Sequence, residues 1–353
     1  MKRVPIKCAV CGALGESVSN ETKVKCQCCG TFNNVDVAAN NFNIYFNEEI
    51  DCGTEKSKPE DFIIEDGILV KYTGSSADVI IPGGVREIAS ECFVGKKLKS
   101  IGIPSSLKKI HGYAFENCID DNILYLSVYI ADLASWCNIE FENTTSNPMY
   151  MGARLYFDGR LVTQLNIPEA VTEIKDSAFV CCNSITKVKM HNGVTAVGAE
   201  AFLGCQNLTS VTMSKQLKYI GNMAFGGCDR LSDVTMYGNV TEISPYMFND
   251  CDSLVSVKIP DGVKKIGTGA FENCNSLKHV EIPESVICIG DVAFRSKNLT
   301  DVVMSGDIED VGEYAFAYYW EAQGLCPRCG RTLKKTLIGK KCKKCKYDHY
   351  IWG

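Results

Sequence analysis

Residues Leu208–Ser276 read LTSVTMSKQLKYIGNMAFGGCDR, LSDVTMYGNVTEISPYMFNDCDS and LVSVKIPDGVKKIGTGAFENCNS, which are three successive units of 23 residues. Apolar residues, a phenylalanine and a cysteine return at the same offsets in each unit, apart from small exchanges. Self-similarity at a period of about 20–30 residues is typical of a solenoid, in which each unit buries its apolar face by stacking on its neighbours. This stretch therefore predicts a repeat solenoid.

The same pattern extends to both sides of this stretch. The repeated phenylalanines at 23-residue spacing are Phe179, Phe202, Phe225, Phe248, Phe271 and Phe294, and Phe316 follows 22 residues later. Each unit contains a short strand, which proline ends in several units because proline cannot donate to a continuing sheet. We predict a β-rich solenoid over residues 61–323, whose degenerate first unit from Asp61 acts as the N-terminal cap.

The 23-residue period fails between Asp120 and about Leu165. The segment is too long for one unit, so we expect an insertion at about residues 120–165 that leaves the stack on one side. Its aromatic residues Trp136, Phe141 and Tyr156 are expected to form a small core over the solenoid. A role of this insertion in binding is the alternative.

A cysteine stands three residues after the repeated phenylalanine in six units. These residues are Cys118, Cys182, Cys205, Cys228, Cys251 and Cys274. Stacked coils would place them about 5 Å apart, a spacing for which disulfides or bound metal are alternatives. Free cysteine is usually a small buried apolar residue, so we predict buried and unreactive thiols. Lys297 and Tyr319 replace the cysteine where the array approaches its end.

Alternate strand residues form one outward row. The row includes Lys187 and Lys189, Ser210 and Thr212, Asp233 and Thr235, Ser256 and Lys258, His279 and Glu281, and Asp301 and Val303. Repeat proteins use such extended rows for recognition, although an ordinary solvated face is the alternative. The candidate binding residues are Lys187, Lys189, Thr212, Asp233, Lys258, His279, Glu281 and Asp301. The row contains no aromatic stripe for bases or sugars and no compact acid–base set.

The N-terminal residues 1–40 contain two CxxCG pairs, Cys8–Cys11 and Cys26–Cys29, separated by fourteen residues. Two such turns with glycine after the second cysteine are typical of a four-cysteine structural zinc site. We predict one Zn ion held by Cys8, Cys11, Cys26 and Cys29, with Cys28 as the alternative fourth ligand. A redox-active CxxC is another alternative, but no βαβ pattern surrounds it. Polar residues 41–60 follow as a linker.

The C-terminal residues 324–353 repeat this pattern. Cys326, Cys329, Cys342 and Cys345 have the spacing of a second zinc ribbon, so two structural Zn ions are predicted. Leu325–Gly353 holds nine Lys or Arg residues and one acid, a formal charge of +8, whereas residues 41–324 carry −15. Nucleic-acid binding by the basic ribbon is therefore one hypothesis. Its alternatives are charge balance at the zinc site and docking of the tail on the acidic solenoid.

The sequence argues against an enzyme and against a membrane span. The four histidines are isolated, and no GxxxxGK[ST], GxSxG or HExxH motif occurs. No window of eighteen uncharged apolar residues is present, and Lys7 interrupts the apolar run of the N-terminal residues. We therefore expect a non-enzymatic protein, placed in the cytoplasm by these absences.

The repeated L-x-x-V-x-I-P and V-x-x-I-x-x-x-A-F with a trailing cysteine resemble the BspA-type leucine-rich-repeat family. The opening segment IEDGILVKYTGSSADVIIPGGVREI and the segment from Trp136 also resemble parts of that family, so the resemblance covers about residues 62–320. It implies a leucine-rich-repeat solenoid with a sheet on one face and, for many relatives, adhesion or protein recognition. We predict a protein-interaction scaffold with an unknown protein partner; nucleic-acid binding and an exported surface adhesin are the alternatives.

Overall fold

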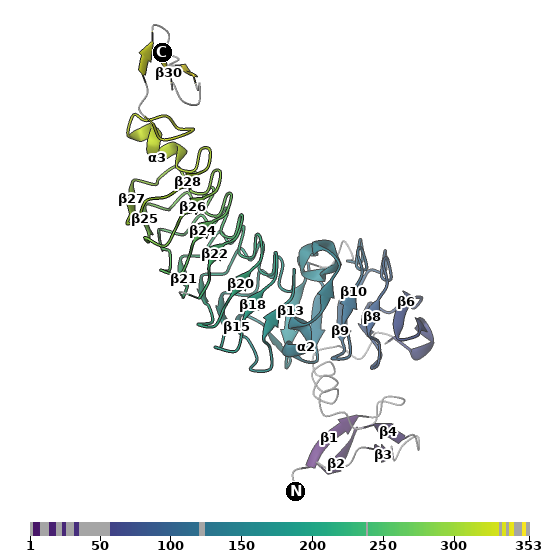
Figure 1. Ribbon diagram of the computed structural model, residues 1–353. Coiled ribbons are helices and arrows are strands. Elements are labelled where there is room, and N and C mark those ends of the chain that lie inside the picture. The colour runs from purple at the N-terminus through teal and green to yellow at the C-terminus, as the bar shows by residue number, and fades with distance from the viewer. Residues whose placement is uncertain are drawn as a thin grey trace. The chain divides into compact units, whose positions relative to one another are not determined.

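The computed structural model describes residues 57–119, 124–237 and 239–331, together with the backbone of short strands near both ends of the chain. The chain divides into two compact units. Unit 1 comprises residues 1–148 and 152–162, and unit 2 comprises residues 149–151 and 163–353. Each unit is built of stacked coils (Figure 1). No helix in the described part of the chain has the length and apolarity needed to span a membrane.

In unit 1, every coil contributes one strand to each of two sheets. The first sheet has the order β12 (Glu140–Phe141), β10 (Lys109–Ile110), β8 (Glu87–Ile88), β6 (Ile68–Tyr72) and β5 (Phe62–Glu65). The second has the order β14 (Arg160–Leu161), β13 (Arg154–Phe157), β11 (Ser127–Ile130), β9 (Ser100–Ile103) and β7 (Asp78–Ile80). Within these two sheets, β5–β6 and β13–β14 pair antiparallel and the other strands pair parallel, so each sheet has a hairpin at one edge.

Unit 2 continues the same coil design, with parallel pairing throughout residues 164–311. The longer strands are β15 (Gln164–Asn166), β17 (Lys187–Lys189), β19 (Ser210–Thr212) and β21 (Asp233–Thr235), and then β23 (Ser256–Lys258), β25 (His279–Ile282) and β27 (Asp301–Met304). The shorter strands are β16 (Glu173–Ile174), β18 (Ala196–Val197) and β20 (Tyr219–Ile220), and then β22 (Glu242–Ile243), β24 (Lys265–Ile266), β26 (Cys288–Ile289) and β28 (Asp310–Val311).

Helices are few and short. They are η1 (Pro59–Asp61), α2 (Leu133–Cys137), η2 (Thr144–Ser146), η3 (Pro148–Met151) and α3 (Ala317–Ala322). The backbone strands near the ends are β1 (Arg3–Lys7), β2 (Leu14–Val18), β3 (Lys23–Lys25) and β4 (Phe32–Asn34), and then β29 (Lys334–Thr336), β30 (Gly339–Lys341) and β31 (Asp348–Tyr350). These terminal strands pair antiparallel.

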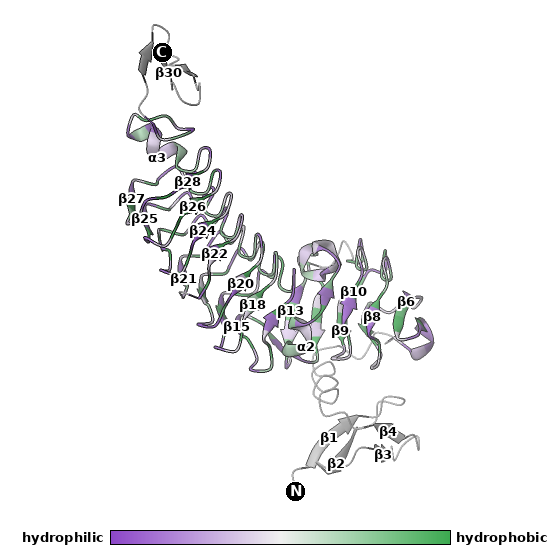
Figure 2. Ribbon diagram, viewed as in Figure 1, coloured by the Kyte–Doolittle hydropathy of each residue, from purple (hydrophilic) through white to green (hydrophobic). Residues whose placement is uncertain are grey.

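Stacked phenylalanine rings run through the core of unit 2. Successive rings from Phe179 to Phe316 lie 5.1–5.7 Å apart between centroids, with interplanar angles of 2–16°. Each ring is at most 1% exposed. A spacing near 5 Å is the distance between hydrogen-bonded strands, so the ring stack and the sheets share one repeat. Figure 2 shows the alternation of hydrophobic and hydrophilic residues within each coil that produces this core.

The row of six cysteines is buried, as the sequence predicts. All six side chains are 0% exposed. In four of them the thiol donates to the carbonyl oxygen of the phenylalanine 26 residues earlier, at sulfur–oxygen distances of 3.0–3.3 Å. Burial raises the pKa of Cys182 to about 11 and those of Cys118 and Cys274 to about 12. The row is therefore a structural feature of the core.

The assignment of Lys297 as the replacement for cysteine is wrong. Ser296 occupies the position: it is 0% exposed, and its hydroxyl donates to the carbonyl oxygen of Phe271 at 2.8 Å. The shift by one residue follows from the shorter spacing between Phe294 and Phe316. A hydroxyl can therefore take the role of the thiol where the turn is shorter.

The segment at about residues 120–165 differs from the expected insertion. Its strands stay within the stack, because β11 pairs parallel with β9, and β12 pairs parallel with β10. The extra residues form α2 and the hairpin β13–β14. Trp136 packs edge-on against Phe141 as predicted, but Tyr156 stacks on Tyr129 instead. Periodicity in sequence was lost because the loops changed length, whereas the strand pairing was kept.

A turn with the CxxCG pattern covers one edge of the last coil. The amide of Tyr314 donates to the carbonyl oxygen of Arg328. In earlier coils the equivalent amide donates to a carbonyl oxygen of the next coil, as the amide of Val292 does to Glu313. The guanidinium of Arg328 forms an ion pair with Glu313 at 2.5 Å. Trp320 of α3 packs on Phe316, and Gly330 lies against the Trp320 ring. Residues 326–330 thus accept the backbone hydrogen bond that a further coil would accept.

Candidate binding face

The outward residues of the longer strands in unit 2 lie where the alternation predicts them. Their neighbours Val188, Val211, Val257 and Val280 are 0–6% exposed and point into the core. The outward residues therefore project to solvent on the other side of the strands. The strand register places Lys187 beside Gln164 and Ser210, and Lys189 beside Asn166 and Thr212.

Four of the eight candidate residues form one charged cluster on β23, β25 and β27. Nδ1 of His279 lies 2.7 Å from Oδ2 of Asp301, and Nε2 lies 3.4 Å from Oε1 of Glu281. Lys258 Nζ lies 3.7 Å from the other oxygen of Glu281. The hydrogen bond to Asp301, and then the one to Glu281, raise the pKa of His279. These side chains form ion pairs with one another, so this part of the face has few unpaired charges available to a partner.

The remaining four candidates, Lys187, Lys189, Thr212 and Asp233, lie on β17, β19 and β21. Neither Lys187 nor Lys189 has an ion-pair partner among the residues that the structure describes, because the strands on both sides present amides and hydroxyls. Both lysines are exposed. This part of the face therefore keeps its positive charge available.

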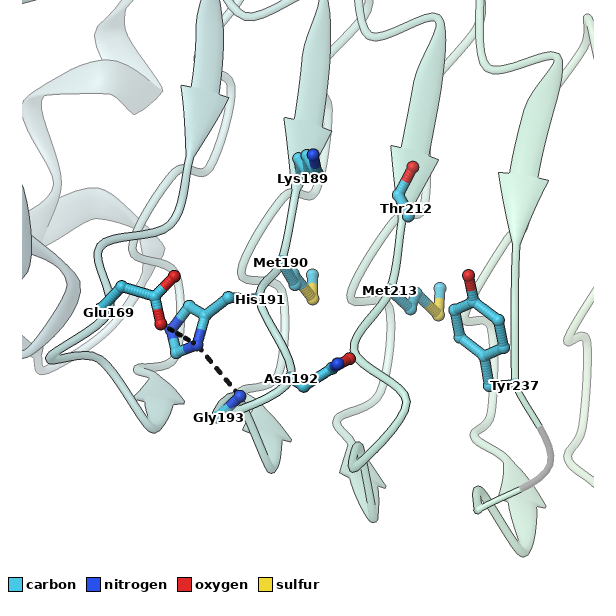
Figure 3. A pocket seen from close by; sticks show the side chains of 9 residues that line it. All are labelled: Glu169, Lys189, Met190, His191, Asn192, Gly193, Thr212, Met213 and Tyr237. Atoms are coloured by element: carbon cyan, nitrogen blue, oxygen red, sulfur yellow. Dashed lines mark hydrogen bonds and ion pairs between the residues drawn. The ribbon is translucent and has the colours of Figure 1, made fainter.

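A groove opens at the carboxyl ends of these strands (Figure 3). Its volume is about 530 Å³, which lies within the range of about 300–1,000 Å³ for ligand sites. Lys189 and Thr212 lie at its strand side, and Met190 and Met213 follow them in the chain. The other lining residues are Glu169, His191, Asn192, Gly193 and Tyr237.

The groove occurs where the usual ending of the strand changes. Five other coils have the dipeptide Ile-Pro here: Ile81–Pro82, Ile103–Pro104, Ile167–Pro168, Ile259–Pro260 and Ile282–Pro283. Three consecutive coils replace it with Met190–His191, Met213–Ser214 and Met236–Tyr237. Met190 and Met213 are 4% and 2% exposed, whereas Met236 and Tyr237 are half-buried. The Tyr237 ring and the loops that follow β17 and β19 therefore line an open space.

His191 holds one side of the groove in place. Gly193 N–H donates to its Nδ1 at 3.0 Å, and Nε2 lies 3.0 Å from the carbonyl oxygen of Val171 in the preceding coil. The exposed carboxylate of Glu169 lies 3.2 Å from Nδ1 at the rim. The imidazole therefore connects two coils and serves as a fixed wall.

Tyr237 forms the opposite wall. Its ring carries the ammonium group of Lys215 at 5.6 Å from the centroid, within cation–π distance. The amide of Lys215 in turn donates to the side chain of Asn192 at 3.3 Å. Lys215, like Lys187 and Lys189, is exposed. Lys189 thus lines the groove, Lys215 lies over its Tyr237 wall, and Lys187 projects from the same strand as Lys189, in a segment whose overall charge is negative.

The outward row was predicted from sequence, but the groove was not. Lys189 and Thr212 belong to both, while Met190, His191, Met213 and Tyr237 were missed. The change from Ile-Pro to Met-X in three successive coils was the available signal. In the sequence analysis proline indicates only where a strand ends, and the coils that lack it are not distinguished from the others.

The zinc prediction falls mostly outside the described residues. This applies to Cys8, Cys11, Cys26, Cys29, Cys342 and Cys345. Cys326 and Cys329 are described: the amides of Cys329 and Gly330 both donate to the carbonyl oxygen of Cys326, and Gly330 has a φ of +66°. This is the tight turn that the CxxCG pattern predicts. Within residues 57–119, 124–237 and 239–331, no three His, Cys, Asp or Glu side chains group to hold a metal.

Comparison with known proteins identifies the repeats. The family model described as "BspA type Leucine rich repeat region" matches in six copies, over residues 69–151, 150–266 and 241–324. No curated protein matches the chain.

Several solved structures are similar to the chain. A leucine-rich-repeat protein of T. pallidum is 19% identical, with 75% of this chain and 90% of that chain covered and a TM-score of 0.41. One from Eubacterium ventriosum is 19% identical, with coverages of 67% and 63% and a TM-score of 0.49. One from Bacteroides ovatus is 18% identical, with coverages of 89% and 90% and a TM-score of 0.38.

Proposed function

The chain belongs to the BspA-type leucine-rich-repeat family, and from this premise we propose that it is a non-enzymatic scaffold that binds another protein. The binding surface is the outward face of β15, β17, β19 and β21 together with the groove at their carboxyl ends. The observation that carries the proposal is the coincidence of unpaired charge and a formed hollow on one face. Elsewhere on the row, at His279, the charges are already paired.

The repeats supply rigidity to this surface. Strand pairing, ring stacking and thiol hydrogen bonds connect each coil to the next. A rigid face loses little conformational entropy when a partner binds, which favours affinity. The mixed polar rim and partly apolar hollow resemble the composition of protein interfaces more than that of a catalytic site.

We also propose that residues 1–40 and 324–353 each bind one structural zinc ion through four cysteines. The spacing of the CxxCG pairs supports both sites. The turn at Cys326–Gly330 supports the second, since it already has the backbone conformation of a metal-binding knuckle. Cys326 and Cys329 would supply thiolates there, and zinc with four protein ligands would stabilise the fold without chemistry at the metal.

Affinity capture from the source lysate, with nuclease added, tests the scaffold proposal. We expect the full chain to retain a protein that is lost from a variant carrying Lys187→Glu and Lys189→Glu. A matched variant with Lys258→Glu, whose lysine is paired with Glu281, should retain it.

A second variant separates the nucleic-acid alternative. Changing Lys343, Lys344 and Lys346 to glutamine removes basic charge from the tail and leaves the solenoid face intact. Nuclease treatment or the lysine-to-glutamine variant of the tail could remove all bound material while the Lys187→Glu, Lys189→Glu variant retains it. In that case the basic ribbon is the recognition element and the scaffold proposal is wrong.

A further inference from the structure

The groove at Met190, Met213 and Tyr237 has the chemistry of a side-chain pocket beside a cationic rim. Resting on the proposed protein-binding function, we propose that this groove receives an extended acidic segment of the partner, with one large apolar side chain in the hollow and flanking carboxylates on Lys187, Lys189 and Lys215. The occupant is thus a peptide whose apolar residue is surrounded by Asp or Glu.

The apolar part of the proposal rests on the lining. Met190 and Met213 belong to the core but reach the groove at the strand ends. Thioether side chains adapt to an inserted group and make favourable contacts with aromatic rings. Tyr237 adds a half-buried aromatic wall, and a ring of this kind is enriched among residues that dominate interface energies. A side chain that fills the hollow therefore gains apolar contact on two sides.

The charge of the occupant follows from the rim. Lys187 and Lys189 project from one strand and have no ion pair within the described part of the chain, and Lys215 stands over Tyr237. The one carboxylate in the lining, Glu169, lies beside His191 at the opposite end of the groove from Tyr237. Residues 41–324 carry a formal −15, so this cluster is a local reversal of sign. Long-range repulsion by the body and local attraction by the lysines would guide an acidic segment to this position.

An extended segment fits the groove better than a helix does. The groove crosses successive coils at the strand ends, and coils repeat at the 5 Å ring spacing. Lys187 and Lys189 lie two residues apart along β17, a separation of about 7 Å. In an extended peptide, carboxylates two residues before and two residues after the inserted residue point to the same face as that residue. A strand-like peptide can therefore place its apolar side chain in the hollow and its carboxylates toward the lysines on the same face of the protein.

Synthetic peptides test the inference directly. The probe is a fluorescein-labelled peptide with one phenylalanine between two pairs of glutamates, measured by fluorescence anisotropy against the full chain. Two counterparts replace the phenylalanine with alanine, or the glutamates with lysines. We expect the first peptide to bind at least about tenfold more tightly than either counterpart, with binding that weakens as salt increases.

Substitutions locate the binding. Lys189→Glu and Tyr237→Ala should each weaken the first peptide by about tenfold. The pair Met190→Ile and His191→Pro, which restores the sequence of the preceding coil, removes the thioether and the imidazole from the lining and should reduce the preference for phenylalanine. Tyr219→Ala, at a tyrosine 58% exposed outside the groove, and Lys258→Glu are the matched controls and should leave binding unchanged.

Three results would overturn the inference. The first is that the phenylalanine peptide does not bind at millimolar concentration. The second is that the phenylalanine and alanine peptides bind equally. The third is that Lys258→Glu weakens peptide binding as much as Lys189→Glu does. The second result would reveal a simple anion site. The capture experiment tests the whole binding face, whereas the peptides test only the groove. If a protein is captured but any of these three results is obtained, the acidic-peptide inference is wrong and the scaffold proposal is still supported.

Discussion

The thiol of Cys228 donates a hydrogen bond to the carbonyl oxygen of Phe202 in the preceding coil, with 3.3 Å between sulfur and oxygen. The same relationship joins Cys205 to Phe179, Cys251 to Phe225 and Cys274 to Phe248. Each thiol thereby adds a donor to a buried carbonyl oxygen. One residue type thus provides packing and a polar contact in four successive coils.

We expect Cys228→Ala to destabilise the solenoid by about 0.5–1.5 kcal/mol, because it removes this hydrogen bond while the Phe202 carbonyl keeps its bond from the amide of Cys205. Urea unfolding followed by circular dichroism measures the change. Cys181→Ala is the control, since Cys181 is only half-buried and stands outside the row; a surface-type substitution changes stability by about 0.5 kcal/mol or less. Equal effects of the two substitutions would contradict a role for the hydrogen bond.

The same burial predicts which thiols react. A thiolate is the reactive form, and burial raises the pKa values of Cys118 and Cys274 to about 12. We expect these two cysteines to remain unlabelled by iodoacetamide in the native protein at pH 8. The half-buried Cys181 and Cys288 should be labelled before Cys118 and Cys274. Peptide mass spectrometry distinguishes the sites, and early labelling of Cys274 would contradict the prediction.

Gly221→Ala should be more damaging than most glycine substitutions. A Cβ at this position would fall on the backbone nitrogen of Ala199 in the preceding coil, which cannot move without breaking strand contacts. We expect a loss of about 1–3 kcal/mol or more, as for overpacked cores. Gly83→Ala is the matched control, because a Cβ there meets nothing within 4 Å. Thermal melts of both variants would show whether close approach is the cause.

How much could be read from the sequence differs between the fold and the site. The Phe and Cys offsets predicted the solenoid and the buried thiols, because stacked units repeat the same environment at every coil. The segment after Asp120 was interpreted wrongly because strand pairing does not require a constant loop length. The need for glycine at position 221 comes from the close approach of Ala199, which only the packing of two coils reveals.

At the binding face, too, the sequence predicts which residues point outward but not how they interact with residues of neighbouring coils. Lys189 and Thr212 were placed outward by alternation alone. Whether a lysine is paired depends on the neighbouring coil, so the sequence did not separate Lys189 from the self-paired Lys258. The hollow depends on Tyr237 and Met190 from different coils. A comparison of aligned units for loss of Ile-Pro would have indicated its position.

His279 should titrate above its ordinary pKa near 6.5. Hydrogen bonds to Asp301 and Glu281 favour the charged imidazolium and raise the pKa. The stabilisation is therefore complete below the ordinary pKa and is lost as pH rises through the raised value. We expect the melting temperature advantage of the native protein over His279→Gln to shrink between pH 6 and pH 8. NMR titration of the His279 ring checks the pKa, and Asp301→Asn should lower it.

Metal removal should loosen the last coil and leave the middle of unit 2 unchanged. The amide of Tyr314 donates to Arg328 within the Cys326–Gly330 turn, whereas the amide of Phe271 donates to Ala293 in the regular stack. If zinc holds this turn through Cys326 and Cys329, a chelator will free Arg328 and speed hydrogen exchange at Tyr314. Exchange at Phe271 is the internal control. Protein prepared under reducing conditions should contain about two zinc ions per chain before chelation. Less than one, or equal exchange at Tyr314 with and without chelator, would contradict the proposed link between zinc and the end of the solenoid.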